Sequence, residues 1–141
     1  MRDEHTVICS PTVFELIAPD APVVPVKVDL SYHGCDPYAV RASFRTGNST
    51  VEWVFARDLL HEGLTGPAGS GDVRVQPLPT NPQKIQLELS SPSGYAVFTT
   101  CAKALGAFIA RTFEIVPAEA EYSWTDFDVA LAGLLNDSAL D

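Results

Sequence analysis

The sequence predicts an α+β domain in which a mostly antiparallel sheet of about seven strands is followed by two C-terminal helices. Hydrophobic residues alternate with polar ones, at a period of two, through most of the first hundred residues. Most of the eleven prolines also fall there and cut the chain into short segments. Beyond Thr100 the hydrophobic spacing changes to three and four. A chain of 141 residues, 46% of them hydrophobic, suits one domain over 1–141.

Seven segments are expected to be strands because β-branched or aromatic residues alternate in them with polar residues. These segments are 12–18, 24–32, 38–44, 51–55, 72–76, 84–90 and 95–100. Residues 24–32 show the pattern most clearly, with Lys27 and Asp29 on the polar side. Residues 46–50 and 91–94 are rich in Gly, Asn, Ser and Pro, which indicates hairpin turns.

The C-terminal part predicts two helices. Residues 101–116 form the first, since one apolar stripe comprises Leu105, Phe108, Ile109, Thr112 and Phe113. Pro117 ends it. The second begins near Ser123, a suitable N-cap, and carries acidic residues in its first turn, where they favour the helix dipole. A short helical turn is also expected within 58–64.

A glycine-rich stretch at 63–77 raises the question of phosphate binding. Gly66 and Gly71 have the separation found in a phosphate-binding loop, but Asp72 and Val73 stand where that loop needs Lys and Ser or Thr. The stretch also precedes a predicted strand rather than a helix. The glycines are therefore expected to turn the chain and not to hold a phosphate.

Charge bounds the classes of partner. The formal net charge is −9, and seven acidic residues but no basic ones follow Arg111. Because nucleic-acid affinity depends on neutralising phosphates, this distribution argues against nucleic acid. A local basic face is still possible, and its members would be Arg41, Arg45, Arg57 and Arg74, with ordinary solvated charges as the alternative. The acidic C-terminal third, including the loop 117–124, is the candidate docking surface for a protein partner, with an ordinary solvated loop and helix face as the alternative.

No catalytic, cofactor or metal motif emerges. His5, His33, His61 and Cys35 lack zinc-site spacing, and no serine has the context of a hydrolase nucleophile. The cysteines Cys9, Cys35 and Cys101 are expected to be reduced and partly buried. Apolar runs are too short to span a bilayer, so the chain is expected to be soluble and cytoplasmic.

Three aromatic residues allow two interpretations. Tyr38, Trp53 and Phe55 could form a stacking platform for single-stranded nucleic acid on a sheet face. They could equally belong to the core beneath the C-terminal helices.

Three stretches together resemble one family. They are DPYAVRASF at 36–44, TVEWVFARDLLHEGL at 50–64 and GPAGSGDVRVQP at 66–77. Their order and gaps resemble those of the SsgA-like proteins, regulators of sporulation-specific cell division in spore-forming actinobacteria, and VEWVFARDLL is most similar to the SsgB branch.

The resemblance implies a strongly bent sheet similar to that of the plant Whirly single-stranded-DNA-binding proteins, assembled as a homotrimer. It implies no enzymatic activity and no cofactor. The family resemblance implies a protein that marks septum sites in the cytoplasm, recruits the tubulin-like protein FtsZ and works with an SsgA-like paralogue, without inserting into the membrane. A Whirly-like module that binds single-stranded nucleic acid is the alternative.

Two sets of residues follow from this interpretation. The first would bind the protein partner through the acidic C-terminal segment, and comprises Glu119, Glu121, Tyr122 and Asp126. The second would form a turn that sets the direction of the next strand, and comprises Gly66, Gly69, Gly71 and Asp72.

Overall fold

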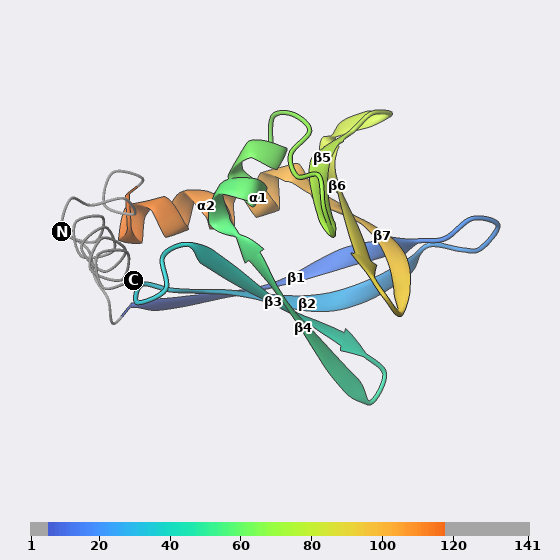
Figure 1. Ribbon diagram of the computed structural model, residues 1–141, viewed down its shortest axis with the longest axis horizontal. Coiled ribbons are helices and arrows are strands. Elements are labelled where there is room, and N and C mark those ends of the chain that lie inside the picture. Colours follow the sequence, from blue (N-terminus) through green and yellow to red (C-terminus); the bar gives the residue numbers. More distant parts are fainter. Residues whose placement is uncertain (1–5, 118–141) are drawn as a thin grey trace, which may run out of the picture.

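The computed structural model describes residues 6–117, which form one seven-stranded antiparallel sheet with both helices on the same side of it (Figure 1). The strands are β1 (Val7–Ile17), β2 (Val24–His33), β3 (Ala39–Thr46), β4 (Ser49–Ala56), β5 (Val73–Leu78), β6 (Asn81–Ser91) and β7 (Gly94–Cys101). The helices are α1 (Arg57–Gly63), between β4 and β5, and α2 (Ala102–Ile115), after β7. None of the helices within 6–117 is long and apolar enough to cross a membrane.

The strand order is β4-β3-β2-β1-β7-β6-β5, so β1 joins two groups of consecutive strands. β1 pairs with β2 along ten residues but with β7 only at Glu15, Leu16 and Ile17. The sheet curls at this junction, and the hairpin that links β1 to β2 projects from the body (Figure 1). Within residues 6–117, the rest of β1, from Val7 to Val13, has a neighbouring strand on one side only.

The core lies between the curled sheet and the two helices. It forms because alternate residues of each strand point to one face, as the burial pattern of β2 shows from Val26 to Tyr32. Three phenylalanines meet at the centre of the curl: the ring of Phe44 lies 5.5 Å from that of Phe14 and 5.0 Å from that of Phe98. Each such buried side chain contributes about 1.5–3 kcal/mol to the free energy of unfolding.

Arg57 is fully buried where β4 passes into α1. Its guanidinium Nη1 donates to the Tyr32 hydroxyl at 3.1 Å and to the carbonyl oxygens of Thr112 and Val116 at 3.0 and 2.7 Å. The ring of Phe113 lies 4.0 Å from the guanidinium carbon. The cation thus satisfies carbonyls at the C-terminus of α2, where the helix dipole favours positive charge.

Most predicted elements are confirmed. All seven strands, the short helix in 58–64, the helix at 101–116 and both hairpin turns are present, and β1 and β6 begin earlier than expected. The predicted second C-terminal helix lies outside the described residues. The expectation of partly buried thiols is wrong, because Cys9, Cys35 and Cys101 are all exposed. Each has an outward-facing or turn position, which hydropathy alone does not reveal.

Candidate functional site

The four residues predicted to bind a protein partner, Glu119, Glu121, Tyr122 and Asp126, lie outside the described residues. The end of α2, just before them in sequence, is well anchored. The Val116 N–H donates to the Thr112 carbonyl at 2.9 Å, and Val116 is fully buried.

The predicted glycine turn depends on one member most. Gly69 has φ +88°, and a Cβ there would lie 2.3 Å from the Val73 carbonyl oxygen. Gly66 and Gly71 have no heavy atom within 4 Å of a Cβ position. The turn is fastened by paired backbone hydrogen bonds between Ala68 and Val75, at 2.8 and 2.9 Å. The Asp72 carbonyl accepts from the Ser90 N–H at 2.8 Å, which ties the turn to β6.

The close packing of Gly63 against Val75 is a feature that the sequence did not predict. A Cβ at Gly63, at the end of α1, would lie 2.3 Å from the Val75 side chain of β5. The helix therefore approaches the strand more closely than any other residue would allow. A glycine at a helix end usually indicates a cap, so the sequence carried no signal for this packing role.

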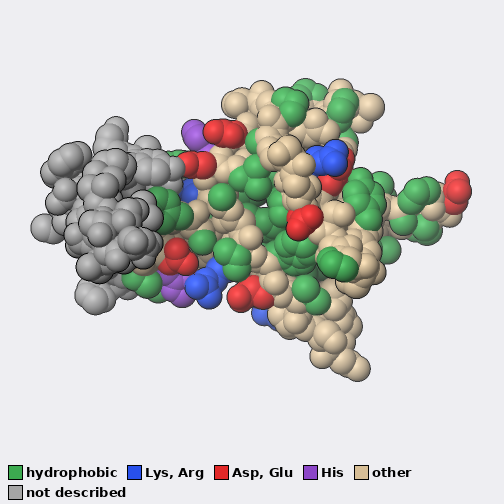
Figure 2. Space-filling model, viewed as in Figure 1, with side chains coloured by type: hydrophobic (Ala, Val, Ile, Leu, Met, Phe, Trp, Pro, Cys, Tyr) green, Lys and Arg blue, Asp and Glu red, His purple; other side chains and the backbone are tan. Residues whose placement is uncertain are grey.

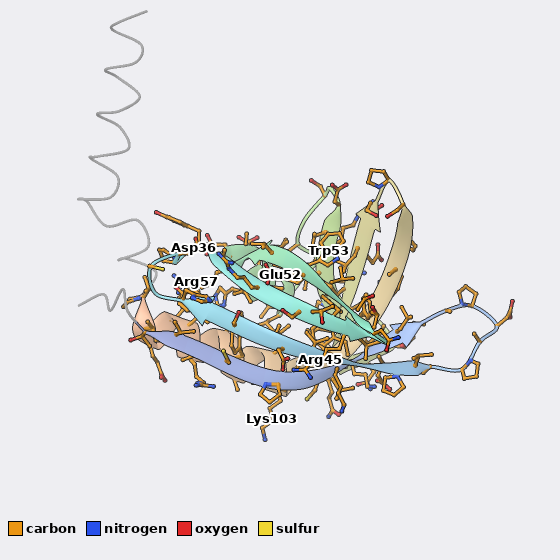
Figure 3. All side chains as sticks on the ribbon, turned by 90° about the horizontal axis from the view of Figure 1, so that it is seen from below. Asp36, Arg45, Glu52, Trp53, Arg57 and Lys103 are labelled. Atoms are coloured by element: carbon orange, nitrogen blue, oxygen red, sulfur yellow. The ribbon has the colours of Figure 1, made fainter. Side chains whose placement is uncertain are left out.

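The possible basic face does not form. Arg57 is buried, and Arg41 lies 3.6 Å from Asp36 and 4.0 Å from Glu52. Arg45 lies 2.7 Å from Asp29. Figure 3 shows Arg57 within the fold, apart from Arg45. Three of the four arginines are thus divided between the core and exposed ion pairs, and Arg74 lies exposed on β5, at the other end of the strand order from β3 and β4.

The aromatic platform is also absent. Phe55 is buried, Trp53 packs partly buried against the core, and their rings stack with centroids 6.3 Å apart. Tyr38 is 44% exposed and is not part of the hydrophobic core, although its carbonyl accepts from the Arg57 N–H close to the end of β4. The alternative interpretation, that Trp53 and Phe55 belong to the core, is therefore confirmed.

Metal ligands do not gather in the described part of the chain. No group of three or more His, Cys, Asp or Glu side chains is close enough there to hold an ion. The His61 ring instead packs edge-on against Phe113, with centroids 5.0 Å apart.

The most prominent exposed feature is apolar and lies at the projecting β1–β2 hairpin. A groove of about 580 Å³ separates the base of the hairpin from the start of β7. We define the hairpin patch as seven residues that line this groove or adjoin it in the hairpin: Ile17, Ala18, Pro19, Val23, Val24, Tyr95 and Val97. Figure 2 shows hydrophobic side chains along the projecting arm and an acidic side chain at its tip. Exposed apolar patches of this kind mark interaction sites.

Two polar features of this region differ in position, because Tyr95 belongs to the hairpin patch whereas Glu15 and Lys84 line a separate groove. Tyr95, 65% exposed, has a raised pKa because of partial desolvation and the nearby Glu88 carboxylate, so its hydroxyl remains a hydrogen-bond donor at neutral pH. On the same strand, Thr99 is covered by an ion pair between Glu15 and Lys84. The Lys84 ammonium donates to Glu15 and holds the pKa of that carboxyl below its usual range. The arrangement offers an apolar contact with a polar rim and no nucleophile or acid–base pair, which suits protein binding.

Comparison with known proteins identifies the family. A family model described as "Streptomyces sporulation and cell division protein, SsgA" matches residues 26–121. The sporulation-specific cell division protein SsgB of Saccharopolyspora erythraea is 50% identical over 136 residues, which cover 96% of each chain. SsgB of Streptomyces coelicolor is 43% identical over 136 residues, covering 95% of this chain and 99% of that protein.

Two solved structures have the same fold. One, from work on SsgB mutations that correlate with longitudinal cell division during sporulation of Streptomyces coelicolor, has a TM-score of 0.79 at 41% identity and covers 86% of this chain and 98% of that one. The other, an SsgA-like sporulation-specific cell division protein of Thermobifida fusca, has a TM-score of 0.80 at 39% identity and covers 94% and 98%. The chain therefore belongs to the SsgA family of sporulation and cell division proteins, as its sequence motifs indicated.

Proposed function

We propose that this protein is a non-enzymatic adaptor in sporulation-specific cell division, which marks septum sites and recruits FtsZ. The names of its relatives supply the process. The hairpin patch is the observation that supports an adaptor. It exposes apolar side chains at the edge of a groove, as surfaces that bind other proteins do. The protein would act in the cytoplasm at division septa, through contacts with other proteins rather than by membrane insertion.

We further propose a homotrimer that works with an SsgA-like paralogue. Several copies of one weak docking surface, held together and facing a filament, bind more tightly than a single copy because the effective concentration rises. The acidic segment with Glu119, Glu121, Tyr122 and Asp126 would supplement the hairpin patch as a second contact. Sedimentation velocity of the purified protein tests the trimer.

Co-sedimentation with GTP-assembled FtsZ from the same organism tests recruitment. The wild-type chain should pellet saturably with filaments, and the variant Val23→Asp/Tyr95→Asp should not. The matched control, Val51→Asp/Val54→Asp, adds the same charge at exposed valines of β4 and should pellet like wild type. Equal recovery of both variants would exclude the hairpin patch, and recovery no greater than that of an unrelated acidic protein would exclude direct recruitment.

The acidic segment is tested separately by Glu119→Lys/Glu121→Lys. If this segment contributes, its variant should bind FtsZ filaments more weakly, and the salt dependence of binding should change. Unchanged affinity would remove the segment from the proposal and leave the hairpin patch.

The alternative of a Whirly-like module that binds single-stranded nucleic acid has weaker support. It rests on an architectural likeness, and fold does not determine function. The positions of three arginines also disfavour nucleic-acid binding, because Arg57 is buried and Arg41 and Arg45 are in ion pairs with carboxylates. A gel-shift titration with single-stranded DNA at physiological salt tests this alternative, and superposition on a Whirly structure tests the likeness.

A further inference from the structure

Two grooves meet at Val13, an exposed residue of β1, and the first residues of α2 line one of them. The larger, of about 780 Å³, is lined by residues that include Glu15, Pro25, Lys84 and Lys103. The smaller, of about 360 Å³, is lined by Pro11, Thr12, Val13, Lys27, Asp29 and Arg45. Val13 lines both, so they form one continuous surface across β1, which we call the β1 saddle.

The β1 saddle concentrates positive charge in an acidic chain. Four of the nine basic side chains line it, Lys27, Arg45, Lys84 and Lys103, together with only two acids, Glu15 and Asp29. Both acids are engaged, because Glu15 pairs with Lys84 and Asp29 pairs with Arg45. Two cations remain, and neither has an ion-pair partner within residues 6–117.

The remaining cations occupy opposite sides of Val13. Lys27 is the direct cross-strand partner of Val13 and, on its other side, of Arg45. Like charges directly opposite each other on a sheet repel, so an anion placed here would relieve an unfavourable pair. Lys103 extends from the start of α2 into open space in Figure 3, beyond the unpaired edge of β1.

Next to the β1 saddle, from Pro11 back to Val7, β1 has no second neighbouring strand within the described chain. Glu15 is paired with Thr99 of β7. The backbone carbonyl of Val13 also points toward β7, because it accepts from the Thr100 hydroxyl at 3.3 Å. Since backbone groups alternate in direction along a strand, Val7, Cys9 and Pro11 face the same side. No strand of the described chain pairs with them there, and Pro11 has no N–H to offer. The N–H groups of Val7 and Cys9 therefore face a side of β1 on which no strand of the described chain pairs with them.

We propose that the β1 saddle binds an extended acidic peptide segment of a partner protein. The segment adds as a strand along the open edge of β1, which gives affinity through main-chain hydrogen bonds. Its carboxylates lie beside Lys27 and Lys103, and an apolar side chain between them contacts Val13. This surface is separate from the hairpin patch, so the inference does not depend on which partner the hairpin patch binds.

The backbone edge favours a peptide over a nucleic acid. A nucleic acid would use the two remaining cations for phosphates, but it would meet the Glu15 and Asp29 carboxylates and leave the edge of β1 unpaired. A peptide satisfies both the cations and the edge.

Fluorescence anisotropy with a fluorescein-labelled peptide of alternating Glu and Val tests the proposal on the full chain at physiological salt. The peptide should bind saturably, and Lys27→Gln/Lys103→Gln should weaken binding about tenfold. The control Arg74→Gln/Arg111→Gln removes the same charge elsewhere and should bind like wild type. A peptide N-methylated at alternate residues should lose binding, because it cannot form the main-chain hydrogen bonds.

Several results would overturn the proposal. They are the absence of saturable binding, equal weakening in both variants, and undiminished binding of the N-methylated peptide. Tighter binding of a single-stranded oligodeoxythymidine with the same lysine dependence would assign the β1 saddle to phosphates. A change in oligomeric state of the Lys27→Gln/Lys103→Gln variant by sedimentation velocity would assign it to a second copy of the chain.

Discussion

Arg57 and Arg45 stand twelve positions apart in sequence and occupy opposite sides of the same sheet, and their surroundings differ in every respect. Arg57 is 0% exposed and donates to a hydroxyl and two carbonyl oxygens. The Arg45 side chain is 61% exposed and pairs with one carboxylate at 2.7 Å. The comparison shows that the inner region uses a cation to connect backbone and hydroxyl groups of the core, whereas the outer region leaves its cation in an exposed ion pair.

Arg57→Ala should have the largest effect on stability. The substitution leaves buried carbonyls at the end of α2 without their donor and opens a cavity, so the free energy of unfolding should fall by about 3 kcal/mol or more. Urea denaturation followed by circular dichroism measures it. A loss below about 1 kcal/mol would remove the distinction between the two regions.

Gly69→Val should rank second. A side chain at φ +88° is strained, and its Cβ would clash with the Val73 carbonyl, so stability should fall by about 1–3 kcal/mol. Gly71→Val is the control, because open space surrounds that position and its φ is not positive. Equal melting temperatures of the two variants would contradict the role assigned to Gly69.

Arg45→Ala should cost little. The exposed pair with Asp29 contributes less than about 1 kcal/mol, and the substitution also relieves the repulsion with Lys27. A double-mutant cycle with Asp29→Ala at low and high salt measures the coupling. A coupling as large as the loss in Arg57→Ala would show that the outer region is structural too.

Lys84→Gln should have the smallest effect, seen only in pH dependence. Because Lys84 lowers the Glu15 pKa below the ordinary 4.5, the pair stabilises the fold above about pH 4.5, and this contribution is lost as the pH falls through the lowered value. In the variant the Glu15 pKa should return toward 4.5, which an NMR titration of that carboxyl measures. An unchanged Glu15 titration would mean that the pair does not form in solution.

The sequence predicted the periodic parts of this fold and missed the parts set by tertiary contacts. Alternation identified all seven strands and the 3.6-residue stripe identified α2, because both patterns reflect burial of one face. Nothing local distinguishes Arg57 from Arg45, since each ends an alternating strand or follows one. The burial of Arg57 depends on α2, more than 50 residues later in the chain, as the Arg57–Thr112 hydrogen bond shows.

The candidate sites show the same division. Gly69 could be proposed from the loop composition, but the contact of Gly63 with Val75 required the approach of α1 to β5. The hairpin patch and the β1 saddle escaped sequence analysis because no local pattern distinguishes most of their residues from other apolar or charged residues of strands and helices. They depend on the sheet order, in which β1 lies between two groups of strands. Within the described chain, this order leaves the first half of β1 with a neighbouring strand on one side only.

The hydrogen bonds of Arg57 to Thr112 and Val116 have a consequence for the segment that follows. They fix the place from which the chain leaves α2 at Pro117, three residues after Glu114 and just before the acidic run that begins at Glu119. Arg57 thus holds the point at which the segment with these six carboxylates is joined to the folded part of the chain. Replacing Arg57 would loosen this attachment point without changing the number of acidic residues that follow it.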